Sequence, residues 1–202
     1  MLDRHLRPLI DPTLNRLGRS LAGRGITADA LTLAGLALGI AASTAVVVGA
    51  FGMALGLLLA SRLADGLDGA VARASRTTDF GGYLDITCDF LFYGLFPLAF
   101  VLHDPLANGV AGAILLTSFY ANGASFLGYA ILAERRGLQS SARGVKSLYF
   151  TGGLLEGTET ILFFVLLCLW PAGFGPVALI FAGLCFLTAL SRVLLARQVF
   201  RG

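Results

Sequence analysis

Long apolar stretches, separated by short polar interruptions, run through most of this sequence. Six of them can be delimited, and they cover residues 28–50, 53–74, 80–102, 107–133, 150–170 and 175–197. As an α-helix with a rise of about 1.5 Å per residue, each is long enough to cross about 30 Å of hydrocarbon. The pattern therefore predicts an all-α integral membrane protein with six transmembrane helices.

The N-terminal residues follow a different pattern. Leucine and isoleucine recur at spacings of three and four between residues 2 and 21, with arginines between them and with Pro8 and Pro12 breaking the run. This periodicity is typical of an amphipathic helix on a membrane surface, and a soluble helix that binds a partner protein is the alternative. We expect an amphipathic juxtamembrane segment over residues 1–27 and one six-helix membrane domain over residues 28–202.

Composition and charge placement agree with a membrane protein. Hydrophobic residues make up 56% of the chain and charged residues 13%, with a mean hydropathy of +0.81. The 15 lysines and arginines gather on one side of a six-span topology, whereas the connections near 50–53, 103–107 and 170–175 contain none. By the positive-inside rule, both termini should lie on the cytoplasmic side of a bacterial inner membrane. The net charge of +3 indicates an anionic lipid bilayer as the partner and argues against nucleic acid.

Four aspartates stand close together in the second and third apolar stretches. Asp65 and Asp68 are three residues apart, and Asp85 and Asp89 are four apart, so each pair shares one face of its helix. Because a short turn around residues 76–81 makes the two helices antiparallel, the pairs can converge. Buried carboxylates are costly in a membrane, and four of them repel one another unless cations bind. Oxygen ligands favour Mg²⁺ or Mn²⁺, so we expect two divalent ions, an arrangement suited to phosphoryl chemistry.

The residues around these aspartates resemble the signature of the CDP-alcohol phosphotransferase family, D-x2-D-G-x2-A-R-x7–8-G-x3-D-x3-D. Every fixed position is filled, by Asp65, Asp68, Gly69, Ala72, Arg73, Gly81, Asp85 and Asp89. The resemblance implies that the protein transfers a phosphatidyl group from CDP-diacylglycerol to a small alcohol acceptor, with release of CMP, in phospholipid synthesis. It also implies that the active site lies at the cytoplasmic side of the membrane.

The resemblance further implies a role for each matching residue. Asp65, Asp68 and Asp85 would bind one metal ion, and Asp89 would join Asp65 and Asp85 around the second ion and act as the general base. The residues that would border the cytidine diphosphate are Gly69, Ala72, Arg73 and Gly81.

A second family element, T-P-N-x-x-T, is similar to residues 27–32, where Ala28 and Asp29 replace the proline and the asparagine. Asp29 is therefore a candidate nucleotide-binding residue, and its alternative role is a plain N-cap of the first membrane helix.

The acceptor alcohol is less well defined than the donor. A phosphate on the acceptor could be bound by the basic residues Arg143, Lys146 and Arg192. Glu156 and Glu159 suit hydrogen bonds to sugar hydroxyls or pairing with an amine, and ion pairs with Arg192 or Arg62 are the alternative. The run from Asp89 to Pro97 also resembles the D-x3-[FY]-G-x2-P run of bacterial phosphatidylserine synthases. Phosphorylated and unphosphorylated acceptors both stay open.

Other classes of membrane protein also bury carboxylates. Intramembrane prenyltransferases hold Mg²⁺ and a pyrophosphate on two Asp-rich motifs, but they generally need about nine spans. A cation-coupled or proton-coupled transporter is the non-enzymatic alternative, although this chain has no repeat symmetry. Small residues in the stretches 35–49 and 118–128 favour close helix packing, either within the chain or in a homodimer.

Overall fold

A computed structural model describes residues 3–137 and 157–200 of the chain, with side chains from Ile10 onward. The described residues are almost entirely helical. The elements are α1 (Asp3–Gly23), α2 (Ala28–Val47), α3 (Phe51–Ala74), α4 (Asp79–His103), α5 (Pro105–Arg135), α7 (Gly157–Leu169), the 3-10 turn η1 (Pro171–Gly173) and α8 (Phe174–Phe200). Within the described ranges, the helices coincide with the predicted apolar stretches to within a few residues.

Polar residues just before the apolar runs set the helix starts. Thr27 caps α2 by accepting a hydrogen bond from the Ala30 amide at 3.2 Å, and Thr78 caps α4 by accepting one from the Gly81 amide at 3.0 Å. Each cap satisfies a backbone donor that the first helical turn leaves without a partner. Asp29 lies inside the first turn of α2. Its interpretation as the N-cap is therefore wrong, because the Thr27 hydroxyl already fills that position.

Helix α1 differs from the expectation at its prolines. The sequence pattern predicted a segment broken by Pro8 and Pro12, but α1 is one helix from Asp3 to Gly23. A proline removes one backbone donor, and a helix at a wet surface can offer the freed carbonyls to water, which lowers the cost of continuing through it. The amphipathic segment is thus a single helical element.

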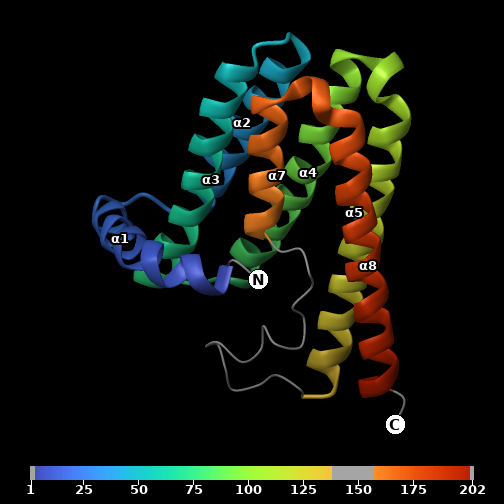
Figure 1. Cartoon of the computed structure of the whole chain (residues 1–202). Helices are drawn as coiled ribbons and strands as arrows, with labels where there is room; N and C mark the ends of the chain where they lie inside the picture. The colour runs from blue at the N-terminus through green and yellow to red at the C-terminus, as the bar shows by residue number, and fades with distance from the viewer. Residues whose placement is uncertain (1–2, 138–156, 201–202) are drawn as a thin grey trace.

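The long helices run side by side, and α1 lies at a steep angle to them beside the C-terminal end of α3, while α5 and α8 extend further (Figure 1). Helix α1 packs on α3, α2 packs on both α3 and α4, and α5 packs along α8. Gly18 allows α1 to pack tightly against α3, since a Cβ there would lie 2.7 Å from the carbonyl carbon of Ala70 on α3. The surface helix is therefore anchored on the helix that carries Asp65 and Asp68.

Aromatic side chains fill the centre of the bundle. Phe92, Phe96 and Phe100 of α4 and Phe164 of α7 are fully or almost fully buried, and the Phe96 and Phe164 ring centroids are 4.8 Å apart. This cluster continues to Phe174 at the start of α8. Because Phe92 is only three residues beyond Asp89, the aromatic core begins directly behind the aspartates.

Four elements in the described part of the chain are long and apolar enough to cross a membrane. They are α2, α4, α5 and the segment Pro171–Phe200, which joins η1 to α8. Helix α3 has 24 residues but carries Arg62, Asp65, Asp68 and Arg73, and α7 is a shorter apolar helix of 13 residues. The all-helical membrane architecture agrees with the prediction, whereas the count of six spans stays a prediction.

Candidate functional site

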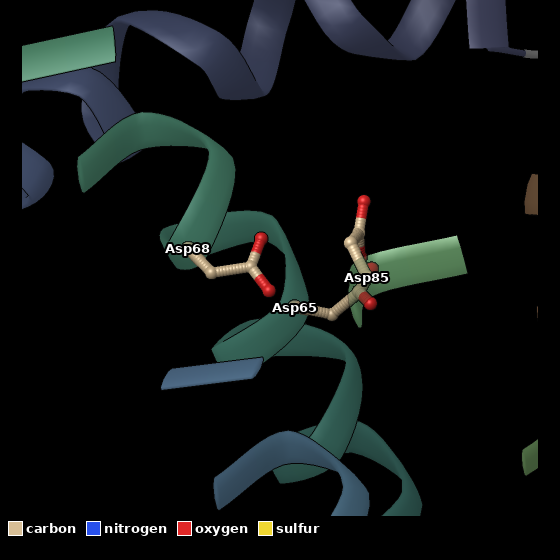
Figure 2. Close-up of side chains that lie close together, drawn as sticks. All are labelled: Asp65, Asp68 and Asp85. Carbon is tan, nitrogen blue, oxygen red and sulfur yellow. The ribbon is translucent and has the colours of Figure 1, made fainter. Parts of the chain in front are cut away.

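Helices α3 and α4 bring three of the four aspartates together. Ligand oxygens of Asp65, Asp68 and Asp85 all lie within 4.8 Å of one another. Figure 2 shows Asp65 and Asp68 projecting from successive turns of α3, with Asp85 reaching them from α4. The convergence expected from the two helical spacings is therefore present. We call these three residues the carboxylate cluster.

A threonine from a third helix binds the most buried member of the cluster. Asp68 is 6% exposed, and its Oδ2 accepts a hydrogen bond of 2.7 Å from the Thr32 hydroxyl of α2. This bond leaves Oδ1 of Asp68 available and holds the carboxylate in one orientation. Thr32 is the last residue of the second family element, and its contact with Asp68 was not expected from the sequence.

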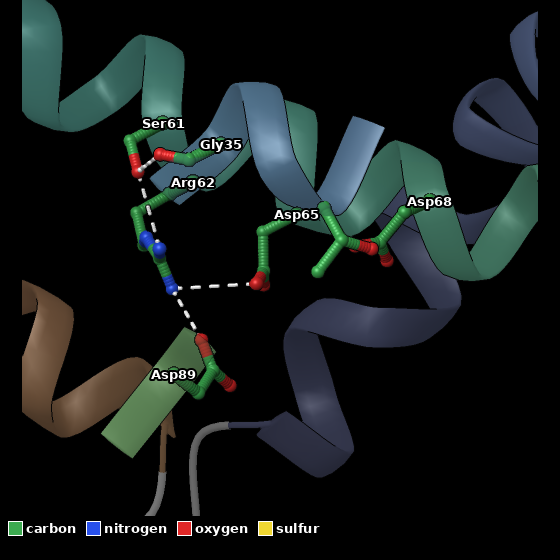
Figure 3. A network of polar contacts seen from close by, with 7 residues as sticks. Gly35, Ser61, Arg62, Asp65, Asp68 and Asp89 are labelled. Atoms are coloured by element: carbon green, nitrogen blue, oxygen red, sulfur yellow. Dashed lines mark hydrogen bonds and ion pairs between the residues drawn. The ribbon is translucent and has the colours of Figure 1, made fainter. Parts of the chain in front are cut away.

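Asp89 lies beside the carboxylate cluster and pairs with Arg62. The Arg62 Nη1 is 2.9 Å from Oδ1 of Asp89 and 3.4 Å from Oδ1 of Asp65, so one nitrogen bridges α4 and α3 (Figure 3). The Arg62 side chain is only 9% exposed. From the sequence, Arg62 was expected as a possible ion-pair partner of Glu156 or Glu159; its partners in the structure are Asp89 and Asp65.

The residues expected to border the nucleotide lie around the N-terminal ends of α2 and α4 and the C-terminal end of α3. Asp29 and Gly81 are neighbours, since a Cβ at Gly81 would lie 3.1 Å from Oδ1 of Asp29. The exposed Arg73 folds back toward Gly69, where a Cβ would lie 3.2 Å from its Nη1, and its Nη2 donates to Asn15 Oδ1 of α1 at 3.0 Å. Ala72 is half-buried on the same helix. The structure thus places the Asp29 carboxylate beside Gly81 and the Arg73 guanidinium beside Gly69.

Only part of the expected acceptor site falls within the described residues. Arg143, Lys146 and Glu156 lie outside them, and Glu159 is half-buried in the first turn of α7. Arg192 of α8 is 7% exposed, and its Nη1 donates to Asn122 Oδ1 at 2.9 Å and to Ser125 Oγ at 2.6 Å on α5.

Arg192 lies at a depth in the bundle close to that of Asp89. Gly123, which follows Asn122, has no room for a side chain because the Phe90 ring fills that space. Phe90 is the neighbour of Asp89 in α4, so α5 meets α4 at the level of Asp89. The hydrogen bonds from Arg192 to α5 therefore place the guanidinium near the same level of the bundle.

The donor set at the carboxylate cluster fits a hard divalent cation. The donors are all oxygens, they come within 4.8 Å of one another, and Asp68 is already oriented by Thr32. Arg62 is the one cationic side chain within 4 Å of these aspartates among the described residues, so four carboxylates face a single guanidinium. Further positive charge is required for all four to be ionised together.

One relative of known sequence resembles the chain over almost its whole length, and another resembles it over less than half. Inner membrane protein YnjF of Escherichia coli is 50% identical over 193 residues, which cover 96% of this chain and 94% of that protein. An archaetidylinositol phosphate synthase of Pyrococcus horikoshii is 38% identical over 85 residues, which cover 42% of this chain and 45% of that enzyme.

A solved enzyme shares the fold. The phosphatidylinositol phosphate synthase PgsA1 of Mycobacterium tuberculosis, in its structure with CDP-DAG bound, matches with a TM-score of 0.72 at 22% identity, over 91% of this chain and 93% of that one. A second structure of that enzyme, in complex with manganese and citrate, matches with a TM-score of 0.70 at 22% identity, over 90% and 88% of the two chains.

The family model for CDP-alcohol phosphatidyltransferase matches residues 25–194, a range that starts just before α2 and ends within α8. It includes all four aspartates, Arg62 and Thr32. Together with the YnjF match, it shows that this chain belongs to the CDP-alcohol phosphatidyltransferase family.

Proposed function

We propose that the carboxylate cluster and Asp89 form the active site at which this enzyme transfers a phosphatidyl group from CDP-diacylglycerol to a polar alcohol. Family membership makes the chain a divalent-metal-dependent transferase of this class. The observation that carries the site assignment is the convergence of Asp65, Asp68 and Asp85 from two helices to within 4.8 Å. Because the chain belongs to this family, no observation favours the alternatives of a prenyltransferase or a transporter.

The four aspartates would have two roles, metal binding and proton transfer. Asp65, Asp68 and Asp85 would hold one Mg²⁺ or Mn²⁺ ion, and Asp89 would join Asp65 and Asp85 around a second. Such ions supply charge that stabilises a pyrophosphate and its leaving group. The Asp89 side chain is 29% exposed, so an acceptor hydroxyl can approach it; Asp65 is similarly exposed at 33%, and the choice of Asp89 as the base follows the family signature.

The reaction that suits this arrangement is a direct displacement. The acceptor oxygen forms a bond to the lipid-bearing β-phosphorus, and the bond from that phosphorus to the oxygen shared with the cytidylate breaks. The proton of the acceptor hydroxyl passes to Asp89, and CMP leaves with the electron pair. Gly69, Ala72, Arg73, Gly81 and Asp29 would line the cytidine diphosphate, with Arg73 as the cation for its phosphates.

For the acceptor, we propose a phosphorylated polyol as the first candidate. The archaeal relative is named for an archaetidylinositol phosphate, and the mycobacterial enzyme for a phosphatidylinositol phosphate. Arg192 supports this choice, because a buried arginine in a membrane helix is a functional candidate by default. Arg143, Lys146, Glu156 and Glu159 stay candidates for the same acceptor site.

The protein would work in the bacterial inner membrane, with both termini and the active site on the cytoplasmic side. The clustering of basic residues on that side supports this orientation. The small residues that line parts of the apolar stretches support a homodimer as the working form. YnjF, at 50% identity, is named an inner membrane protein.

The deciding experiment is CMP release by the purified protein from CDP-diacylglycerol in the presence of Mg²⁺ or Mn²⁺. The acceptor panel is inositol 1-phosphate, glycerol 3-phosphate, inositol, serine, choline and ethanolamine. We expect metal-dependent CMP with one phosphorylated acceptor, none after removal of the metal with EDTA, and none from Asp89→Asn. Release with serine alone would contradict the acceptor proposal, and no release with any acceptor from folded protein would contradict the reaction.

A further inference from the structure

We propose that Arg62 is a positioning residue of this site, because its guanidinium holds Asp89 at the edge of the carboxylate cluster and competes with the second divalent ion. The proposal rests on the proposed function for the role of Asp89. The residue lies outside the family signature, one turn before Asp65 on α3. Its evidence is the set of contacts that the Arg62 side chain makes.

The guanidinium of Arg62 is fixed from several sides. Its Nη2 donates to Ser61 Oγ at 3.1 Å, and that hydroxyl donates to the Gly35 carbonyl of α2 at 2.7 Å. Its Cζ lies over the Phe92 ring, 4.3 Å from the centroid, which adds a cation–π contact in a buried setting. With its planar group held by a hydroxyl and by an aromatic face, Arg62 presents Nη1 to the carboxylates in one orientation.

Arg62 acts on one oxygen of Asp89. The 2.9 Å hydrogen bond uses Oδ1, and Figure 3 shows the other oxygen of the carboxylate directed away from the guanidinium. The bond therefore fixes the side chain while it leaves an oxygen that can take a proton. A general base must stand within hydrogen-bond reach of the hydroxyl it serves, so this fixation bears directly on turnover.

The same contact sets the electrostatic surroundings of the second ion. Nη1 is shared between Asp89 and Asp65, which are two of the three residues proposed to hold that ion. A positive charge at this position repels an incoming cation and neutralises part of the negative charge of Asp65 and Asp89. Arg62 should therefore keep the second ion weakly bound and exchangeable.

The test compares Mn²⁺ binding and kinetics of the full chain in detergent, with bound Mn²⁺ counted by electron paramagnetic resonance. Arg62→Gln should tighten the weaker Mn²⁺ site about 30-fold or more, as expected for loss of a unit charge about 4 Å from a divalent ion. The value of kcat should fall about 10- to 100-fold because Asp89 is no longer held, while KM for CDP-diacylglycerol stays within about threefold. Arg24→Gln, which removes an exposed arginine from the α1–α2 turn, is the matched control and should change neither.

A double-mutant cycle separates this proposal from a purely structural role. If Arg62 acts through Asp89, the effect of Arg62→Gln on Mn²⁺ affinity should shrink when Asp89 is already Asn. An equal effect in both backgrounds, or wild-type kcat and Mn²⁺ affinity in Arg62→Gln, would overturn the proposal. Because the cycle reads metal binding alone, it still decides the role of Arg62 if the wild-type protein releases no CMP.

A second variant covers the case in which Arg62→Gln does not fold. Arg62→Lys keeps the charge but loses the planar pair of donors, so it should fold and bind Mn²⁺ as the wild type does. Its kcat should fall at least about threefold, because an ammonium cannot contact Asp89 and the Ser61 hydroxyl in the same geometry. Wild-type turnover in Arg62→Lys would show that charge alone suffices and would sink the positioning role.

Discussion

At the scale of single residues, the four aspartates of the site have different surroundings although they are chemically identical. Asp68 is 6% exposed and accepts a hydrogen bond from Thr32, whereas the Asp89 side chain is 29% exposed and accepts one from Arg62. A buried, oriented carboxylate suits a ligand that must hold a cation in place. A carboxylate at the edge suits proton exchange with an incoming acceptor.

This difference predicts separate effects for two conservative substitutions. Asp89→Asn should reduce kcat for CMP release by about 100-fold or more, since it removes the base while the carboxylate cluster stays intact. Asp68→Asn should mainly weaken Mn²⁺ and nucleotide binding, because it removes a charged ligand from the cluster. Isothermal titration with Mn²⁺ and CDP-diacylglycerol, together with turnover, measures both. Equal losses of binding in the two variants would refute the division of roles.

The hydroxyl of Thr32 gives a second prediction at this scale. Thr32→Val keeps the shape of the side chain but removes the donor to Asp68, so Mn²⁺ affinity should fall about tenfold, in the range measured for partners of metal ligands. Thr32→Ser retains the hydroxyl and should stay close to the wild type. Mn²⁺ titration of both variants checks this, and unchanged affinity in Thr32→Val would mean that Asp68 needs no orienting partner.

The sequence predicted the aspartates better than it predicted their partners, and the reason is physical. Asp65 and Asp68, like Asp85 and Asp89, are related by helical spacing within one element, which can be read directly from the chain. Thr32 meets Asp68 only because α2 packs against α3. Such a contact depends on how helices pack together, and spacing along one chain segment does not encode it.

At the scale of the helices, boundaries were predictable wherever a capping residue precedes an apolar run. Thr27 and Thr78 begin α2 and α4, and Asp104 begins α5 by accepting a hydrogen bond from the Ala107 amide at 3.0 Å. Helix α1 was harder to predict, because proline rules concern isolated helices and α1 is supported by its contact with α3. That contact also brings Asn15 to Arg73.

The α1–α3 contact predicts how a small change in α1 affects the site. Gly18→Ala would place a Cβ 2.7 Å from the Ala70 backbone, so α1 must shift, at a cost of about 1–3 kcal/mol. We expect a thermal midpoint lower by several degrees, and a raised KM for CDP-diacylglycerol because Asn15 no longer supports Arg73. The control is Gly23→Ala, where a Cβ would meet nothing within 4 Å. Identical midpoints and KM values in the two variants would show that α1 does not support the site.

At the scale of the whole molecule, charge and architecture agree on one end of the bundle as the working end. Helix α1 and the basic C-terminal ends of α3 and α5 lie toward this end (Figure 1). The carboxylate cluster lies at the C-terminal half of α3, and the aromatic core continues along α4 from Phe92 to Phe100, away from the aspartates. The positive-inside rule then orients the bundle from the same basic residues. The described part of α7 has 13 residues, fewer than the roughly 20 that a membrane-crossing helix needs, so its crossing requires a direct test.

Labelling of single cysteines tests both the orientation and the span count. The native Cys88, Cys168 and Cys185 are buried, so they should give little background with a membrane-impermeant maleimide. Leu106→Cys, at the α4–α5 turn, should be labelled in intact spheroplasts, and Arg135→Cys should be labelled only after the membrane is opened.

Ala172→Cys, at the exposed position of the turn between α7 and α8, shows whether α7 crosses the membrane. If α7 crosses the membrane as the fifth of six spans, Ala172→Cys and Leu106→Cys share a side and both react in intact spheroplasts. If α7 does not cross, α5 has already brought the chain to the side of Arg135, and Ala172→Cys should react only after opening. Labelling of Arg135→Cys in intact spheroplasts would instead invert the orientation, and with it the cytoplasmic placement of the four aspartates.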